Sequence, residues 1–102
     1  MAKLDETIHQ ATRLRIMAAL NALEPGEPGL DFTRLKAMTG ATDGNLGSHL
    51  DTLAKVGYVT VEKSFVDRKP KTRVTATRAG RRAFAEHVAF LKSVIDGSDP
   101  PA

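Results

Sequence analysis

Residues 42–59 read TDGNLGSHLDTLAKVGYV and carry two different hydrophobic periods in succession. The leucines of this stretch recur three and four residues apart, at Leu46, Leu50 and Leu53. That spacing predicts a helix with one face toward a core, and Thr42 is a candidate cap for its N-terminus. After Val56 and Gly57 the period changes to two, because apolar and polar residues alternate. We therefore expect a helix that leads directly into a β-strand.

Two more helices are expected before this stretch. Apolar residues at helical spacing predict one from about residue 4 to residue 23, with Thr12 as a candidate cap for a second start within it. Two Pro-Gly pairs in residues 24–29 then predict a loop. Asp31 is a candidate N-cap for a short helix, and Gly40 is a suitable residue to end it. The tight connection that follows is typical of a helix-turn-helix.

A hairpin and a last helix are expected after the central stretch. Residues 59–65 predict a first strand, the polar residues 67–71 its tip, and residues 72–76 the returning strand. Thr77 is a candidate cap for a helix that Gly97 ends. Residues 98–102 are predicted to be a disordered tail.

This order of elements predicts a winged helix-turn-helix, an α+β fold that is mostly α. Its parts are a helix-turn-helix at about residues 31–56, a two-stranded wing at about 58–76 and a C-terminal dimerisation helix at about 78–96. A chain of 102 residues has room for one domain, which we expect at residues 1–97.

The composition excludes several classes of protein. Apolar residues make up 41% of the chain and charged residues 26%, as in an ordinary soluble globular protein. The absence of cysteine excludes disulfides and thiolate metal sites, and it suits the cytoplasmic location that we expect. The longest apolar run is too short to cross a membrane, and the first residues do not resemble a signal peptide.

The positive charge is concentrated in one part of the chain. Residues 46–85 carry nine basic and three acidic side chains, a net charge of +6. The segments before and after carry net charges of −1 and −2. Such asymmetry favours a polyanionic partner, usually nucleic acid, and a solubilising face is the alternative.

The outward face of the helix after Thr42 is polar. The residues expected to contact DNA from this helix are Asp43, Gly44, Asn45, Ser48, His49, Thr52 and Lys55. Short polar side chains can approach base edges in the major groove, so Asn45 and Ser48 are the candidates for reading bases. Thr52 and Lys55 are better placed for phosphate, whereas phosphate repels the carboxylate of Asp51. A solvated helix face is the alternative interpretation.

Gly44 and Gly47 lie inside this helix, where each glycine costs about 0.5–1 kcal/mol relative to alanine. Close approach of the helix to the DNA backbone is one explanation. Close contact between two helices is the other, and the sequence does not choose between them.

The hairpin tip is the most basic part of the chain. The wing residues expected to contact DNA are Lys63, Arg68, Lys69, Lys71 and Arg73. Arginines on a projecting turn can enter the minor groove, where the phosphate potential is deepest. Arg78, Arg81 and Arg82 can extend this surface, since the helix dipole gives them no stabilising role at a helix start.

The last helix has more apolar surface than one small domain can cover. The residues expected at a homodimer interface are Leu4, Ile8, Phe84, His87, Val88, Leu91, Val94 and Ile95. A two-fold dimer is the commonest way to cover such a surplus. Packing of the helix across its own core is the alternative.

Three segments of the chain resemble the small winged-helix transcriptional regulators of the MarR/ArsR type. They are residues 8–20, IHQATRLRIMAAL, residues 42–59, and residues 77–84, TRAGRRAF. The resemblance covers about residues 5–95. It implies a cytoplasmic homodimer that binds a pseudo-palindromic operator in double-stranded DNA, mostly as a repressor. It also implies that the helix of residues 42–56 reads the DNA and residues 68–71 lie in the wing, although Gly47 and Ala11 depart from the family's usual residues.

No motif for catalysis or metal binding occurs in the chain. His9, His49 and His87 are far apart and have no paired ligand spacing, so we expect neither an enzyme nor a metal or cofactor site. The few aromatic residues give little evidence for an effector pocket. A winged-helix module that binds another protein, or a nonspecific chromatin-like protein, is the alternative function.

Overall fold

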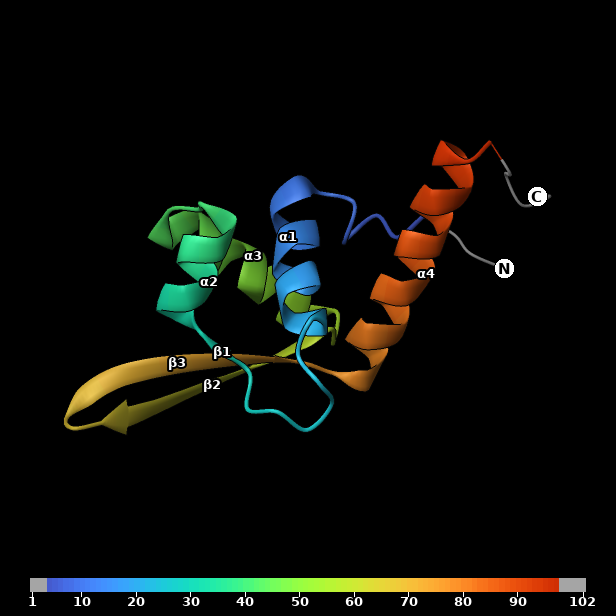
Figure 1. The fold of residues 1–102 in the computed structure, drawn as a ribbon. Helices are drawn as coiled ribbons and strands as arrows, with labels where there is room; N and C mark the ends of the chain where they lie inside the picture. Colours follow the sequence, from blue (N-terminus) through green and yellow to red (C-terminus); the bar gives the residue numbers. More distant parts are fainter. Residues whose placement is uncertain (1–3, 98–102) are drawn as a thin grey trace.

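The computed structural model describes residues 4–97 and has the predicted order of elements with one short strand added (Figure 1). The elements are α1 (Ala11–Asn21), β1 (Leu30–Asp31), α2 (Phe32–Thr39), α3 (Asp43–Lys55), β2 (Val59–Val66), β3 (Lys69–Ala76) and α4 (Arg78–Ile95). Helices α2 and α3 form the helix-turn-helix, and β2 and β3 form the wing. The predicted α+β winged helix is therefore confirmed. The tail expected at residues 98–102 lies outside the described residues.

Side-chain caps begin the last three helices at the predicted residues. Asp31 Oδ1 accepts a hydrogen bond from the backbone N–H of Arg34, at 2.7 Å, and starts α2. Thr42 and Thr77 cap α3 and α4 in the same way. Gly40 ends α2 in the left-handed conformation, with φ 72°. Each cap satisfies backbone groups that a helix end leaves without a partner.

The first helix is shorter than predicted. It begins at Ala11, and Gln10 rather than Thr12 caps it, with its side chain accepting from the N–H of Arg13. The chain before it forms a turn that Asp5 stabilises, because Asp5 Oδ1 accepts from the N–H of Ile8 at 3.0 Å. The apolar spacing across this turn reflects the burial of Ile8 in the core and not a longer helix.

The sheet has three antiparallel strands in the order β1-β3-β2. Strand β1, which the sequence does not predict, lies between the loop expected at residues 24–29 and α2, and it pairs Leu30 with Val74 and Asp31 with Arg73. A strand of two residues has no periodicity to detect, so only its pairing with β3 defines it. Gly29 precedes it and lies so close to the carbonyl of Val74 that a Cβ would overlap that oxygen.

The wing ends in a tighter turn than predicted. Only Asp67 and Arg68 form it, with φ of 52° and 67°, and Lys69 already belongs to β3. Two successive residues with positive φ form the type I′ turn that matches the twist of a hairpin. Pro70 pairs with Phe65 as the second pair from this turn, where its nitrogen points away from β2. A proline is tolerated there because β1 pairs with β3 only at Arg73 and Val74, so no strand of the described residues lies beside Pro70 on that edge.

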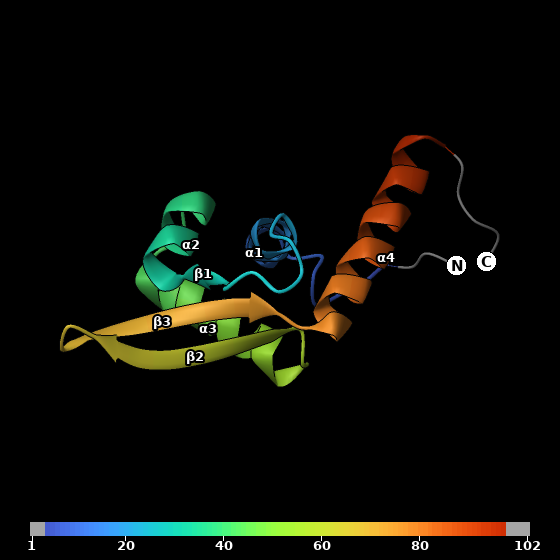
Figure 2. The same cartoon turned by 60° about the horizontal axis from the view of Figure 1, so that its bottom comes forward.

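The core lies where the helices meet the base of the wing. Its buried apolar side chains include the three predicted leucines of α3, together with Ile16, Met17, Leu20, Leu35, Val59 and Val74. The outer half of the wing projects beyond α2 and α3, and α4 lies at the opposite end of the hairpin (Figure 2). The wing is therefore supported at its base alone.

Helix α4 begins against the backbone of Tyr58. The carbonyl of Tyr58 accepts from the N–H of Thr77, at 3.0 Å, and a Cβ on Gly80 would overlap the same carbonyl. A glycine is therefore required in the first turn of α4. This contact sets the direction in which α4 leaves the sheet.

Candidate nucleic-acid interface

Helix α3 has the polar exposed face that the sequence predicts. Asn45, Ser48 and Lys55 are exposed, and Thr52 and His49 are half-buried. The hydroxyl of Thr52 donates to the carbonyl of Ser48, at 3.2 Å. The exposed side chains nearest the start of the helix are thus the short ones that can reach base edges.

Asp43 and Asp51 place negative charge on this face. Asp43 forms an ion pair with Lys36, whose Nζ lies 2.8 Å from Oδ1 of Asp43. This pair offsets the carboxylate at the start of α3. Asp51 is exposed and faces a groove that also contains lysines, described below.

The two glycines of α3 face open space. A Cβ at Gly44 or Gly47 would have no atom within 4 Å, apart from its chain neighbours and the adjacent backbone of α3. Close contact between helices is therefore excluded as the reason for either glycine within this chain. The bare backbone leaves room for a partner on the exposed face of α3.

Arg13 is a residue of this site that the sequence analysis missed. Its Nη1 lies 3.2 Å from Nδ1 of His49, and its Nε donates to the carbonyl of Thr7, at 2.6 Å. A guanidinium can only donate, so His49 Nδ1 accepts and Nε2 carries the proton. Burial and the charge of Arg13 both lower the pKa of His49 below 6.5. Neutral His49 thus presents one N–H donor from α3. No local signal links residues 36 positions apart.

The predicted basic residues of the wing have two different roles. Arg73 is half-buried, and its Nη1 donates to the carbonyl of Gly29, at 3.0 Å, so it ties the wing to the loop before β1. Lys71 Nζ lies 3.7 Å from Asp31. Lys63, Arg68 and Lys69 are exposed, and they give the outer wing its positive charge.

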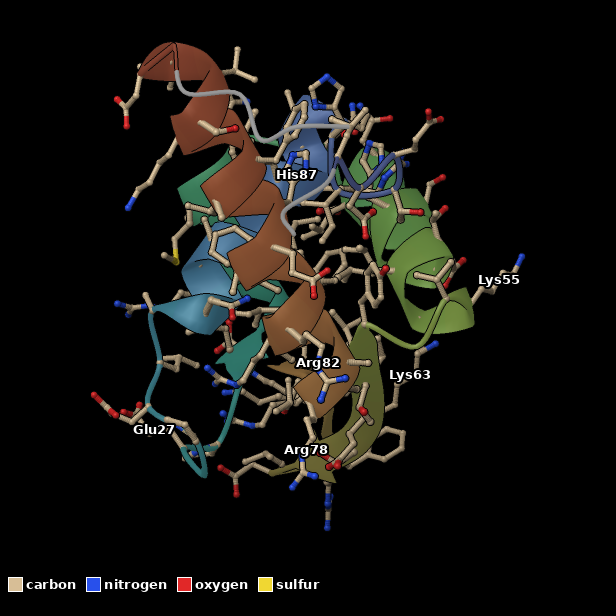
Figure 3. The ribbon with its side chains drawn as sticks, turned by 90° about the vertical axis from the view of Figure 1, so that its right-hand side faces the viewer. Glu27, Lys55, Lys63, Arg78, Arg82 and His87 are labelled. Atoms are coloured by element: carbon tan, nitrogen blue, oxygen red, sulfur yellow. The ribbon has the colours of Figure 1, made fainter. Side chains whose placement is uncertain are left out.

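A groove of about 780 Å³ separates α3 from the wing. Gly47 and Asp51 line it from α3, and Lys63, Lys69 and Lys71 line it from the wing. Lys55 of α3 and Lys63 of β2 lie on the same side of the molecule (Figure 3). The exposed face of α3 and the basic wing therefore form one continuous surface.

The arginines at the start of α4 also divide into two groups. Arg81 Nη2 donates to the carbonyl of Leu23, at 3.2 Å, which ties α4 to the segment that follows α1. Arg78 and Arg82 are exposed in the first two turns of α4, next to the sheet (Figure 3). These two extend the positive charge toward the base of the wing.

The structure places the predicted dimer residues in two environments. Ile8 and His87 have no exposed surface, so their burial in the chain's own core leaves nothing for a partner to contact. Packing within the chain itself explains these two residues, which corrects their assignment to an interface. Leu4, Val94 and Ile95 are exposed, and Phe84, Val88 and Leu91 are half-buried.

Buried His87 is held by the segment before α1. Its Nδ1 accepts from the backbone N–H of Asp5, at 3.1 Å, and the ring of His9 packs edge-on against it at 5.5 Å. Its Nε2 is buried without a hydrogen-bond partner among the described residues. Burial, followed by the charge of His9, lowers the pKa of His87 below 6.5, although the carboxylate of Asp5 acts in the opposite direction.

Within residues 4–97 no group of three or more His, Cys, Asp or Glu side chains is placed to hold a metal ion. In the same residues no helix is long and apolar enough to cross a membrane.

A helix-turn-helix whose second helix lies beside a basic hairpin defines the class of winged-helix DNA-binding proteins. Comparisons with known proteins agree. A family profile described as winged helix DNA-binding domain matches residues 12–95. The uncharacterized protein MJ0432 of Methanocaldococcus jannaschii is 36% identical over 80 residues, which are 78% of this chain and 83% of that protein.

Solved structures show the same fold. The transcriptional regulator homologue protein from Pyrococcus horikoshii OT3 is similar with a TM-score of 0.81 and 31% identity, over 94% of this chain and 91% of that one. A MarR family transcriptional regulator from Silicibacter pomeroyi DSS shares the fold with a TM-score of 0.65 and 20% identity, over 90% of this chain and 58% of that one.

The chain belongs to the winged helix DNA-binding domain family. This is a family of DNA-binding proteins and not of enzymes. The resemblance to winged-helix regulators that the sequence suggests is thereby confirmed.

Proposed function

We propose that this protein is a transcriptional repressor that binds a pseudo-palindromic operator in double-stranded DNA as a homodimer. One observation carries the proposal. The exposed polar face of α3 and the exposed lysines of the wing lie on the same side of the molecule, with a groove between them. A duplex laid against this surface receives α3 in its major groove and the wing at the adjacent backbone or minor groove.

The roles within this surface follow from side-chain chemistry. Asn45 and Ser48 read base edges, and His49 adds a single donor from Nε2. Thr52 and Lys55 contact phosphate from α3, and Lys63, Arg68 and Lys69 neutralise phosphates from the wing. Lys71 and Arg73 must give up their contacts to Asp31 and Gly29 before they bind phosphate. We therefore expect substitution of either residue to weaken DNA binding less.

The second half of α4 supports the dimer. Val94 and Ile95 are 51% and 81% exposed, and half-buried Leu91 and Val88 continue the same helix. A two-fold axis through this surface covers it with an identical one. Two α3 helices related by that axis read half-sites about one helical turn apart. The repressor role and the cytoplasmic location rest on the resemblance to MarR/ArsR regulators and on the DNA partner.

Fluorescence anisotropy with the DNA upstream of the protein's own coding region tests this proposal. Scrambled DNA of equal length is the control, and both are titrated at two salt concentrations. We expect tighter binding to the upstream fragment and weaker binding at the higher salt, since each neutralised phosphate releases counterions. The matched variant Asn45→Ala should reduce the preference for the upstream fragment, whereas Lys55→Ala should weaken binding to both fragments.

Other outcomes separate the alternatives. Equal binding to both fragments indicates a nonspecific chromatin-like protein. No binding at low salt contradicts the DNA-binding proposal and favours a module that binds another protein. Sedimentation of wild type and Ile95→Asp tests the dimer, because a carboxylate in an apolar two-fold interface would dissociate it. A monomeric wild type would contradict the operator geometry.

A further inference from the structure

The wing tip, residues 65–70, is apolar as well as basic. Phe65 is 77% exposed and Val66 is 51% exposed, although both belong to β2. Pro70 is directly opposite Phe65 in the register of the hairpin and is also exposed. Cross-strand partners point to the same face of a sheet, so Phe65 and Pro70 form one apolar pair. Folding of the chain does not account for this pair, because most of the Phe65 side chain lies in water.

The surroundings of this apolar pair carry a net positive charge, because three basic residues outnumber the carboxylate of Asp67. Lys63 is two residues from Phe65 on the same strand face, and exposed Arg68 and Lys69 follow within the tip. The tip lies at the end of the molecule away from α4 and projects beyond the helices (Figure 2). Its turn contains only two residues, Asp67 and Arg68, so the hairpin is narrow at its end. An apolar edge among cations on a narrow projection fits a polyanion that also offers an apolar interior.

The minor groove of duplex DNA has these properties. It is about 6 Å wide between two rows of phosphates, and its floor exposes the edges of stacked bases. Proteins that bind there often insert an apolar side chain between two base pairs, which partly unstacks them and kinks the duplex. Cations beside the inserted side chain hold the tip against the phosphates.

We propose that Phe65, supported by Pro70 and flanked by Arg68, enters the minor groove and wedges against a base step at the outer edge of each half-site. The inference rests on the proposed DNA-binding function. It adds a contact that discriminates sequence through deformability. Pyrimidine–purine steps unstack most easily, so the wing selects a TA or CA/TG step at the position it contacts. Specificity then arises from two places, from hydrogen bonds of α3 and from the unstacking cost at the wing.

An apolar wedge and a phosphate contact leave different signatures. Removal of a lysine that contacts phosphate lowers the slope of log affinity against log salt by about one. Removal of a stacking side chain weakens binding at every salt concentration and leaves that slope unchanged. The pair Phe65→Ala and Lys69→Ala therefore separates the two kinds of contact within one hairpin.

The experiment uses the upstream DNA fragment labelled at both ends with a donor and an acceptor fluorophore. Anisotropy gives the affinity at several salt concentrations, and energy transfer between the ends reports bending. We expect Phe65→Ala to weaken binding about tenfold with an unchanged salt slope, and to remove most of the bend. Phe65→Leu keeps an apolar side chain and should lose less. Circular dichroism should show both variants folded, because the side chain is exposed.

Three results would overturn the wedge. One is a wild-type protein that binds DNA without bending it. Another is a Phe65→Ala variant with a salt slope reduced as in Lys69→Ala. The third is a Phe65→Ala variant with wild-type affinity for DNA, and loss of its binding to vesicles that contain phosphatidylserine would then assign the tip to a membrane surface. Failure of wild type to bind any DNA at low salt would instead remove the proposed function on which the wedge rests.

Discussion

The two ends of the β2–β3 hairpin are built in opposite ways. At its base, Tyr58 donates from its hydroxyl to Asp5 Oδ2, at 2.6 Å, and its backbone pairs with Leu53 and Thr77. At its tip, Asp67 and Arg68 occupy the left-handed region that disfavours side chains, and Phe65 is exposed. The base thus satisfies its polar groups internally, whereas the tip carries backbone strain and uncovered side chains.

This difference separates the base of the hairpin, which stabilises the fold, from the tip, which is exposed for binding. The base joins the segment before α1, the end of α3 and the start of α4, so a change there should affect the free energy of unfolding. The tip contributes little to the core, so a change there should affect binding. Local strain and exposed apolar groups persist where they serve a contact that the free chain lacks. The following substitutions test whether the division is this sharp.

The largest effect is expected at the base, from Gly80→Ala. Its Cβ would overlap the carbonyl of Tyr58, so α4 must shift from the sheet. We expect the free energy of unfolding to fall by about 3 kcal/mol, measured by urea denaturation. The matched control is Gly47→Ala, where the Cβ meets open space. That variant should gain about 0.5–1 kcal/mol from helix propensity. Equal effects of the two would show that the contact with Tyr58 is not specific.

A smaller loss is expected for Tyr58→Phe, which removes the hydrogen bond to Asp5. The expected decrease is about 1–2 kcal/mol at pH 7, because the carboxylate loses a donor. The same bond, followed by burial and the charges of Asp5 and Glu86, raises the pKa of Tyr58 to about 12 from an ordinary value of 10. Its contribution is therefore complete below pH 10 and disappears as the pH rises through 12. The Tyr58→Phe variant should not show this loss of stability at alkaline pH. If its free energy of unfolding depended on pH as that of wild type does, the role assigned to the hydrogen bond would be contradicted.

At the tip, Arg68→Gly should stabilise the protein by about 1 kcal/mol, since glycine adopts positive φ without the cost that a side chain imposes. Thermal unfolding measures this gain. The same variant should lose affinity for DNA and show a salt slope lower by about one. Arg68→Ala is the matched control, because it removes the charge and keeps the strain. A glycine variant that is both less stable and fully able to bind DNA would reverse the division between tip and base.

The smallest effect is expected from His87, which lies near the base and makes the free energy of unfolding depend on pH. Its folded-state pKa lies below the ordinary 6.5, so the unfolded chain binds more protons between these two values. The free energy of unfolding should be constant above pH 6.5 as far as this group is concerned. It should decrease as the pH falls from 6.5 through the folded-state pKa.

Denaturation at a series of pH values from 5 to 8 measures this decrease. We expect His87→Gln to lower the free energy of unfolding at every pH. Its diagnostic result is a weaker dependence of that free energy on pH below 6.5. His49→Gln should remove a separate part of the slope, since the pKa of His49 is lowered as well. A wild-type slope in His87→Gln would show that other groups cause the acid sensitivity.

Local side-chain chemistry explains what could be predicted. Asp31, Thr42 and Thr77 cap their helices because a side-chain oxygen three residues before an amide can accept from it. The leucines of α3 are buried because their spacing places them on one face. These interactions span a few residues, so the amino-acid sequence is enough to recognise them.

Long-range contacts explain what was missed. Strand β1 exists through its pairing with Val74, and Arg13 reaches His49 across two helices. His87 was assigned to a dimer because the last helix has apolar surface that looks surplus until the segment before α1 covers it. Ile8 belongs to that covering segment and is itself buried. No pattern within a short window encodes which distant segment supplies the cover.

The amino-acid sequence by itself determined the winged helix-turn-helix, the polar face of α3 and the basic character of the wing. Periodicity, capping and charge are properties of neighbouring residues and need no partner elsewhere. The tertiary structure alone decided which of the basic residues contact distant groups of the chain, as Arg73, Lys71 and Arg81 do. It also decided that Gly80 must be a glycine and that Phe65 is uncovered. Burial depends on what the rest of the folded chain brings near, and a linear pattern does not contain that information.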